Sequence, residues 1–301
     1  MQPVGRFAPT PSGRMHLGNV FAGMIAWLSV KSRDGEMVLR MEDLDTQRTS
    51  DELAQLLRQD LIWLGLTWDW ETEPQSRRSR VYDGYFEKLR DMDLLYPCYC
   101  TRSQLHSVNA PHLSDGTYVY AGTCRDLTQA QRSAFDRAPS WRVKVPDKIW
   151  TVEDLMQGTY RENLQTDCGD FVVRRADGVY VYQLAVTVDD GEAGVTEVVR
   201  GNDLLSSAPR QMYLQELFGF KHPQYGHVPM LLSVDGRRLS KRDKDLDLGV
   251  LRQKMKPETL LGILANACGL IEQPEAVSAK ELATVFSWDK IKKEDIYLTL
   301  T

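Results

Sequence analysis

The chain has 301 residues, of which 42% are hydrophobic and 26% are charged, and these proportions exclude a disordered or collagen-like protein. Its net charge of -5 excludes a uniformly basic nucleic-acid-binding surface, although it is compatible with a local basic patch. The N-terminus shows no basic region followed by an apolar stretch, and no run of about 18 uncharged apolar residues occurs, so we expect a cytoplasmic protein with no membrane span.

The first 95 residues alternate between strand-like and helix-like patterns. Thr49 followed by Glu52 has the spacing of a capping box at the start of the second helix. Alternating strands and helices favour an α/β protein with a doubly wound, mostly parallel sheet. The predicted elements are a strand at Val4–Ala8, a helix carrying Val20, Phe21, Met24, Ile25 and Leu28, a strand at Met37–Met41, a helix carrying Leu53, Leu56, Leu57, Leu61 and Leu64, and a helix from Tyr82 to Met92.

The regular alternation stops at Tyr96, and the following loops, rich in Cys, Pro and Tyr with short apolar runs such as Trp141–Val145, predict an insertion. We expect the first half of the α/β domain at 1–95, the insertion at 96–170, the second half of that domain at 171–236 and a short helical C-terminal region at 237–301. After the insertion the predicted elements are a hairpin of strands Phe171–Val173 and Val179–Leu184 around Ala176–Gly178, a strand at Val195–Val199, and helices at Pro209–Leu217 and Pro257–Cys268.

A loop rich in Pro, Gly and Ser connects the first predicted strand to the first predicted helix. A helix N-terminus offers N–H groups and a partial positive charge, and Gly18 allows close approach of a phosphate. His16 and Asn19 can donate hydrogen bonds to phosphoryl oxygens. Taken alone, the same pattern is also typical of an ordinary turn.

A basic segment, Arg237–Lys256, contains eight Lys or Arg and three Asp residues, a local charge of +5. It includes Arg238-Leu239-Ser240-Lys241-Arg242. A lysine beside a nucleotide stabilises the negative charge that builds on a transferring phosphate, whereas a charge run can also be a solvated surface.

Five cysteines are present, and three of them, Cys98, Cys100 and Cys124, lie within 27 residues, near His106 and His112. An odd, clustered set is unlike a disulfide framework and fits a reducing compartment with a thiolate-rich zinc site. The alternative is three buried reduced cysteines. The isolated Cys168 and Cys268 are predicted to be small core residues.

Together, His16–Asn19 and Arg238–Arg242 resemble the two signature sequences of class I aminoacyl-tRNA synthetases. Arg6–Gly13, Leu39–Asp45 and Val199–Asp203 are similar to the glutamyl branch, so the resemblance extends from Arg6 to about Lys244. It implies a Rossmann-type catalytic domain that uses ATP with Mg2+ to convert L-glutamate into glutamyl-adenylate, without a protein nucleophile.

The resemblance also implies the residues of the site. Glutamate carries two carboxylates and one ammonium, which suits the guanidinium groups of Arg6 and Arg200 and the carboxylate of Glu42. The alternatives from the residues alone are a surface ion pair between Arg40 and Glu42, and a core-facing strand position for Tyr182. The implied glutamate site is Arg6, Phe7, Ala8, Pro9, Thr10, Glu42, Tyr182 and Arg200; the implied ATP site is Pro9, His16, Gly18, Asn19, Leu239, Ser240 and Lys241, with His16 and Lys241 catalytic.

One position departs from the resemblance. Full-length glutamyl enzymes carry asparagine where this chain has Val186, so one polar contact to glutamate is missing and weaker amino-acid affinity is expected.

The length left after the second signature is similar to that of short paralogues of the glutamyl branch, which lack an anticodon-binding domain. In those paralogues a tyrosine completes the zinc site, which implies a Zn2+ ligand set of Cys98, Cys100, Tyr120 and Cys124. They transfer glutamate to the base queuosine at the wobble position of tRNA(Asp), so the implied partners are ATP, L-glutamate and queuosine-containing tRNA(Asp), and we expect a monomer. Arg237–Lys256 is the candidate RNA contact. The alternatives are a truncated glutamyl-tRNA synthetase that charges tRNA(Glu) and an inactive paralogue that binds RNA or glutamate.

Overall fold

The central feature of the computed structural model, which describes residues 2–105, 119–233, 236 and 247–298, is a parallel sheet. β1 pairs with β2, β2 pairs with β3, and β9 pairs with β10, all in parallel. The Thr196 N–H donates to the Val4 carbonyl at 2.9 Å, which places β9 beside β1 and gives the spatial order β3-β2-β1-β9-β10. The strands are β1 (Val4–Phe7), β2 (Glu36–Leu39), β3 (Trp70–Glu71), β9 (Glu197–Gly201) and β10 (Gln224–Val228).

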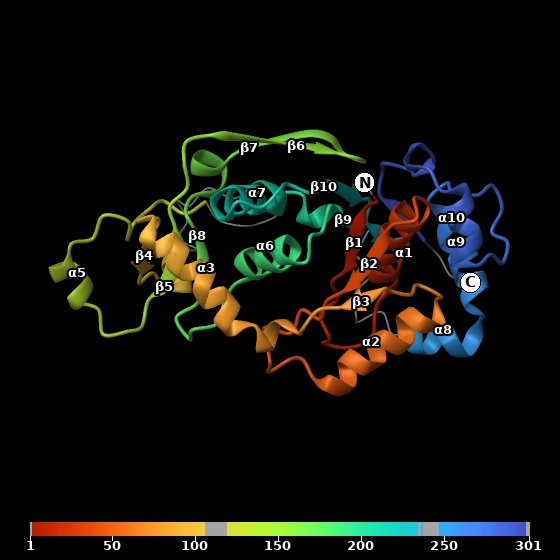
Figure 1. Cartoon of the computed structure of the whole chain (residues 1–301), viewed down its shortest axis with the longest axis horizontal. Helices are drawn as coiled ribbons and strands as arrows, with labels where there is room; N and C mark the ends of the chain where they lie inside the picture. The colour runs from red at the N-terminus through yellow and green to blue at the C-terminus, as the bar shows by residue number, and fades with distance from the viewer. Residues whose placement is uncertain (1, 106–118, 234–235, 237–246, 299–301) are drawn as a thin grey trace.

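Helices cover both faces of this sheet. Figure 1 shows α1 on one side of β1 and β2, and α6 on the other side. The predicted doubly wound α/β architecture is therefore confirmed. The helices of the two halves of the α/β domain are α1 (Leu17–Lys31), α2 (Asp51–Trp63), α3 (Ser79–Asp91), α6 (Tyr182–Glu192) and α7 (Ser207–Phe218).

The capping box predicted for Thr49 and Glu52 is wrong, because the helix α2 begins one residue later with a simple N-cap. Ser50 is the N-cap, and its side chain accepts a hydrogen bond from the Leu53 N–H at 3.2 Å. The Thr49 hydroxyl instead donates to the Asp45 carbonyl at 3.0 Å, which closes the preceding turn. Because both residues are hydroxyl-bearing N-cap types, the sequence pattern could not separate them.

The predicted strand Val179–Leu184 is also wrong. β8 (Phe171–Arg174) does enter a turn at Gly178, whose φ of +87° suits glycine. Only an isolated bridge between Arg174 and Tyr180 follows, and α6 begins at Tyr182. Gln183–Asp190 are all buried, so α6 is enclosed on every side and shows no helical periodicity that would distinguish it from a buried strand.

The inserted region forms a small antiparallel sheet and a long hairpin. The strand order β4-β5-β8 joins strands from both sides of residue 170, the predicted end of the insertion. The domain boundaries therefore stay predictions. The β6–β7 hairpin meets the edge of the parallel sheet where β6 pairs with β10 at Asp154 and Tyr225. The elements are β4 (Leu95–Cys98), α4 (Arg102–Leu105), α5 (Gln129–Ser133), β5 (Ser140–Val143), β6 (Ile149–Asp154), β7 (Gly158–Asn163) and a π-helical turn at Leu164–Cys168.

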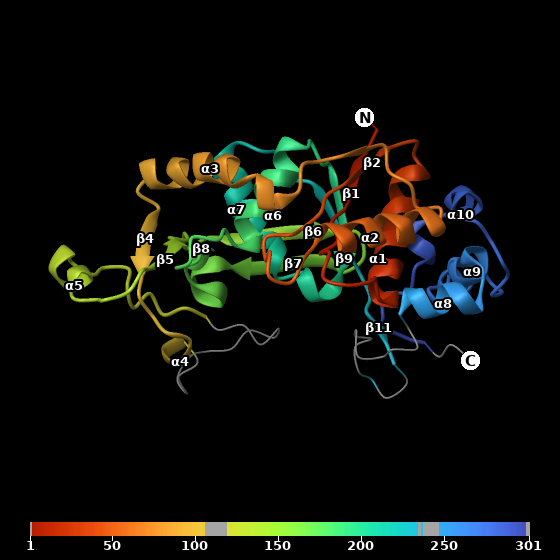
Figure 2. The same cartoon turned by 90° about the horizontal axis from the view of Figure 1, so that it is seen from below.

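The C-terminal helices pack beside α1 at the end of the molecule opposite α5, as both views show (Figures 1 and 2). Apolar residues of these helices, including Leu260 and Leu264, join the core that α1 and β1 build. No helix among the described residues is long and apolar enough to cross a membrane. The remaining elements are β11 (Leu231–Leu232), α8 (Leu248–Lys254), α9 (Pro257–Ala267), α10 (Ala279–Val285), β12 (Ile296–Tyr297) and short 3-10 turns at Gln75–Arg77, Asn202–Leu204 and Trp288–Lys290.

Candidate active site

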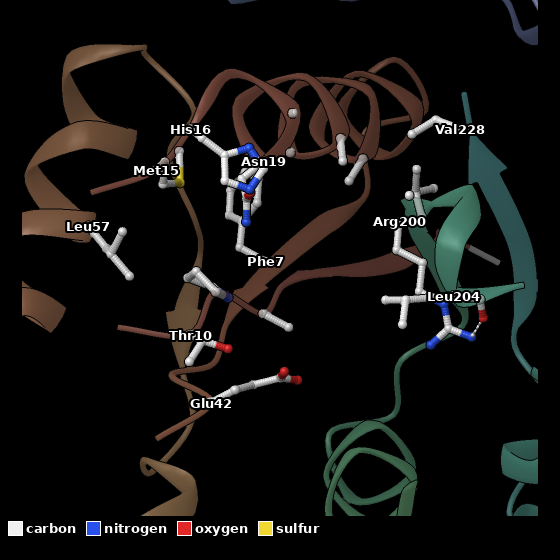
Figure 3. A pocket seen from close by; sticks show the side chains of 18 of the residues that line it. Phe7, Thr10, Met15, His16, Asn19, Glu42, Leu57, Arg200, Leu204 and Val228 are labelled. Carbon is white, nitrogen blue, oxygen red and sulfur yellow. Dashed lines mark hydrogen bonds between the residues drawn. The ribbon is translucent and has the colours of Figure 1, made fainter. Parts of the chain in front are cut away.

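A pocket of about 500 Å³ opens at the carboxyl ends of β1 and β9. The strand order reverses between these two strands, and ligands of open α/β sheets bind at such a reversal. Figure 3 shows the start of α1, Glu42 and Arg200 around one space. The structure brings into this lining every implied site residue that it describes: Arg6, Phe7, Ala8, Pro9, Thr10, His16, Gly18, Asn19, Glu42, Tyr182 and Arg200.

One end of the pocket is the N-terminus of α1. His16 is the N-cap, and the first turn of α1 contains no acidic residue that would oppose the positive end of the helix dipole. A Cβ atom at Gly18 would lie 3.1 Å from two atoms of the His16 ring, so glycine leaves that ring its place. The α1 terminus can therefore receive an anionic group such as a phosphate.

The residues that follow the second signature return to this end of the pocket. Asp247 forms an isolated bridge with His16, and the Leu248 N–H donates to the Met15 carbonyl at 3.4 Å. The buried Asp60 carboxylate accepts from both Arg14 at 2.7 Å and Arg252 at 2.9 Å. These contacts fix α8 beside the first signature; Leu239, Ser240 and Lys241 lie outside the described residues.

The other end of the pocket holds two buried guanidinium groups. Arg6, 6% exposed, donates from Nη1 to the Val199 carbonyl at 3.0 Å, and its Nε lies 3.7 Å from Asp190. Burial lowers the pKa of Arg6, an effect that Asp190 opposes. Arg200, 5% exposed, lies on the neighbouring strand β9. Two adjacent guanidinium groups in a pocket shielded from solvent suit an anionic ligand with carboxylate groups.

Glu42 supplies the negative charge of the site. Its Oε1 accepts from Arg40 Nη2 at 3.1 Å, and the other guanidinium nitrogen of Arg40 donates to Asp190 at 2.5 Å. Burial raises the pKa of Glu42, while Arg40 and Arg6 act in the opposite direction. The surface ion pair considered for Arg40 and Glu42 is wrong, because Arg40 is fully buried.

Tyr182 starts α6 and lines the pocket, so the alternative of a core-facing strand residue is wrong as well. Its hydroxyl accepts from Arg200 at 3.4 Å, and burial raises its pKa. Val186, one turn further along α6, is fully buried and is not among the described residues that line the pocket.

Sequence reasoning missed the residues that hold the charged groups in place. Asp190 forms ion pairs with Arg6 and Arg40. Gln211 and His227 both accept hydrogen bonds from Arg200. The signal for Asp190 was an acidic residue inside the apolar run of α6. A single histidine in a strand carried no such signal, because its partners come from distant segments.

A second cluster lies at the end of β4. The Sγ atoms of Cys98, Cys100 and Cys124 are all within 4.8 Å of one another. The Tyr120 hydroxyl lies 3.5 Å from the Cys98 sulfur and 3.9 Å from that of Cys100. This group could hold a metal ion, because three sulfur atoms and one oxygen converge. His106 and His112 lie outside the described residues.

The thiols of this cluster differ in acidity. Although burial opposes the change, the Tyr120 hydroxyl and the Arg142 guanidinium lower the pKa of Cys98. Burial and the neighbouring sulfur atoms raise the pKa of Cys100 to about 12. Cys168 and Cys268 are buried elsewhere, as the sequence predicts.

Residues 4–296 match the family described as tRNA synthetases class I (E and Q), catalytic domain. The chain is 44% identical to a protein named glutamyl-Q tRNA(Asp) synthetase from Symbiobacterium thermophilum, over 97% of this chain and 94% of that protein. A protein of the same name from Nitratidesulfovibrio vulgaris is 43% identical over 89% and 86%, respectively. The fold is similar to a crystal structure of a glutamate tRNA ligase from Elizabethkingia meningosepticum in complex with its amino acid, with a TM-score of 0.83 and 26% identity over 99% of this chain and 67% of that chain.

Proposed function

Because the chain belongs to the class I tRNA synthetase family for glutamate and glutamine, we propose that it activates L-glutamate with ATP and transfers it to queuosine at the wobble position of tRNA(Asp). The observation that carries glutamate activation is the opposition of Arg6 and Arg200 to Glu42 in one pocket. The relatives named glutamyl-Q tRNA(Asp) synthetase, matched over nearly their whole length, support the acceptor.

The charged groups suit glutamate better than glutamine. Guanidinium groups only donate hydrogen bonds, so Arg6 and Arg200 pair with carboxylate oxygens but meet the N–H groups of a side-chain amide unfavourably. Glu42 uses Oε1 for Arg40, which leaves its second oxygen for the substrate ammonium. Tyr182 adds a hydroxyl beside Arg200.

In the first step a carboxylate oxygen of glutamate attacks the α-phosphorus of ATP, the new O–P bond forms, and the bond to pyrophosphate breaks. Bound Mg2+ supplies charge neutralisation on the phosphates. His16 and the N-terminus of α1 stabilise the phosphate charge on one side, and we assign Lys241 the same role. Gly18 and Asn19 line the same end.

In the second step a hydroxyl of the cyclopentenediol of queuosine attacks the acyl carbon, and AMP leaves. The protein contributes position and charge and forms no covalent intermediate. The anticodon loop would enter with the wobble base splayed out, and Arg237–Lys256 would contact its phosphates. The described part of this segment, 247–256, begins at Asp247, which forms an isolated bridge with the pocket residue His16. A tRNA substrate places the reaction in the cytoplasm.

We assign Cys98, Cys100, Tyr120 and Cys124 as ligands of one Zn2+. Three cysteine sulfur atoms are donors that zinc prefers, and the Tyr120 oxygen beside them brings the number of donors to the four of a tetrahedral site. Zinc would tie the end of β4 to the loop of Cys124 within the inserted region, where it would act as a structural cross-link.

Glutamate-dependent exchange of pyrophosphate into ATP tests the first step. Exchange is expected with glutamate and is expected to be at least 100-fold slower with glutamine or aspartate. If no amino acid supports exchange, the chain is a binding protein for RNA or glutamate and not an enzyme.

Nuclease digestion after transfer of labelled glutamate tests the acceptor. Label on the anticodon fragment of tRNA(Asp) supports the proposed function. Label on the 3′-terminal fragment of tRNA(Glu) would instead identify a glutamyl-tRNA synthetase.

A further inference from the structure

The guanidinium of Arg200 is held in place by a hydrogen bond to a histidine. Its Nε–H donates to Nε2 of His227 on β10 at 2.9 Å, while Nη1 donates to Gln211 at 2.9 Å and Nη2 to the Leu204 carbonyl at 3.2 Å. His227 is fully buried, and its ring stacks on Tyr225 at an angle of 17°. The contacts on Nε and Nη1 therefore fix the plane of the guanidinium that faces the pocket.

The histidine is held in turn by a buried carboxylate. Asp154, at the end of β6, lies with its Oδ2 at 2.6 Å from Nδ1 of His227. Its Oδ1 accepts three backbone N–H groups, from Met156 at 2.9 Å, Gln157 at 3.0 Å and His227 itself at 3.0 Å. Three donors on one oxygen fix the carboxylate, so that the second oxygen is aimed at the ring.

The chain of donors and acceptors permits one protonation state. Arg200 can only donate, so Nε2 of His227 must be the acceptor and the proton must lie on Nδ1, where Asp154 accepts it. Burial lowers the pKa of His227 to about 4, with Asp154 opposing this shift and the Arg200 charge adding to it. A neutral ring with its proton on Nδ1 satisfies both neighbours.

We propose that Asp154 and His227 are positioning residues for glutamate: Asp154 selects the Nδ1–H form of His227, and Nε2 of His227 fixes the Arg200 guanidinium toward the substrate carboxylate. This inference rests on the proposed activation of glutamate and deepens it. Because Asp154 belongs to the β6–β7 hairpin, the inserted region contributes to amino-acid recognition without touching the substrate.

Asp154→Asn tests the selection of the tautomer. Asparagine keeps an oxygen for the three backbone N–H groups but presents an N–H to the ring, which favours the Nε2–H form and sets a donor against Arg200. We expect the KM for glutamate in pyrophosphate exchange to rise about 10- to 100-fold, the loss of one charged hydrogen bond, while the KM for ATP changes less than twofold. A purely structural role would change both KM values or the yield of folded protein.

Two substitutions of His227 distinguish the role of its Nε2 from that of its Nδ1. Glutamine places an amide oxygen near the position of Nε2 and can still accept from Arg200, whereas asparagine reaches only the Nδ1 position. His227→Gln is therefore expected to bind glutamate at least fivefold more tightly than His227→Asn. The exposed His222, substituted to Asn in the same way, is the matched control and leaves both KM values unchanged.

Nitrogen-15 spectra of histidine-labelled protein test the protonation state without substrate. The signals missing from His227→Gln identify this ring in the wild type, where a protonated Nδ1 and an unprotonated Nε2 are expected at pH 7. An Nε2–H form or a charged ring would overturn the inference, and so would an unchanged glutamate KM in Asp154→Asn. Absence of glutamate-dependent exchange in the wild type would instead refute the proposed function, and the spectra would still decide the protonation state.

Discussion

Replacing Arg200 with lysine keeps one positive charge in the pocket but removes the planar fork. The guanidinium lines the pocket and donates to His227, Gln211 and Leu204, and an ammonium group cannot reach all of these acceptors at once. A lost charged hydrogen bond to the substrate costs about 1.5–3 kcal/mol, so the KM for glutamate should rise about 10- to 150-fold. Each buried acceptor left without a donor lowers the free energy of unfolding by about 1–3 kcal/mol.

Pyrophosphate exchange with varied glutamate and varied ATP measures this effect, and chemical denaturation measures the stability. The KM for ATP should stay within twofold, because the phosphate end of the pocket is formed by α1. Arg175→Lys, at an exposed turn outside the pocket, is the matched control. A wild-type KM for glutamate in Arg200→Lys would contradict this role, because it would show that the guanidinium does not contact the substrate.

Three further predictions concern other parts of the molecule. Lys241→Ala should lower the rate of pyrophosphate exchange about 100-fold or more while glutamate still binds in calorimetry, because the lysine acts on phosphate charge; an unchanged rate would remove Lys241 from the catalytic machinery. The wild type should carry one zinc per chain by atomic absorption, and Cys124→Ser should lose it and melt at a lower temperature, whereas zinc-free wild type would contradict the assigned ligand set. His227 has a pKa of about 4 when folded and about 6.5 when unfolded, so the unfolded chain binds the extra proton first as the pH falls. The free energy of unfolding of the wild type should therefore drop by about 3 kcal/mol relative to His227→Gln between pH 7 and pH 4, and parallel pH profiles would show that the ring is not buried neutral.

The sequence predicted those parts of the site that are local in the chain. The strand, loop and helix around His16 form as predicted, and the loop from Arg6 to Thr10 reaches the same pocket as Glu42 and Arg200. These motifs work because each is a short segment whose backbone shape follows from its own residues.

The parts that the sequence could not predict depend on contacts between distant segments. The sequence predicts a strand at Val179–Leu184, where α6 in fact begins at Tyr182, because burial on all sides removes the helical pattern. The burial of Arg40 is set by Asp190, 150 residues away, and the orientation of Arg200 is set by His227 and Asp154 on two other strands. No local pattern encodes such pairings, because the sheet must form before these residues meet.

The most direct test of the account is transfer of labelled glutamate, with ATP, onto tRNA(Asp) prepared with and without queuosine. The account predicts label on the queuosine-containing tRNA alone. Equal label on both preparations would contradict it, because the acceptor would then be a hydroxyl common to both and not the modified base.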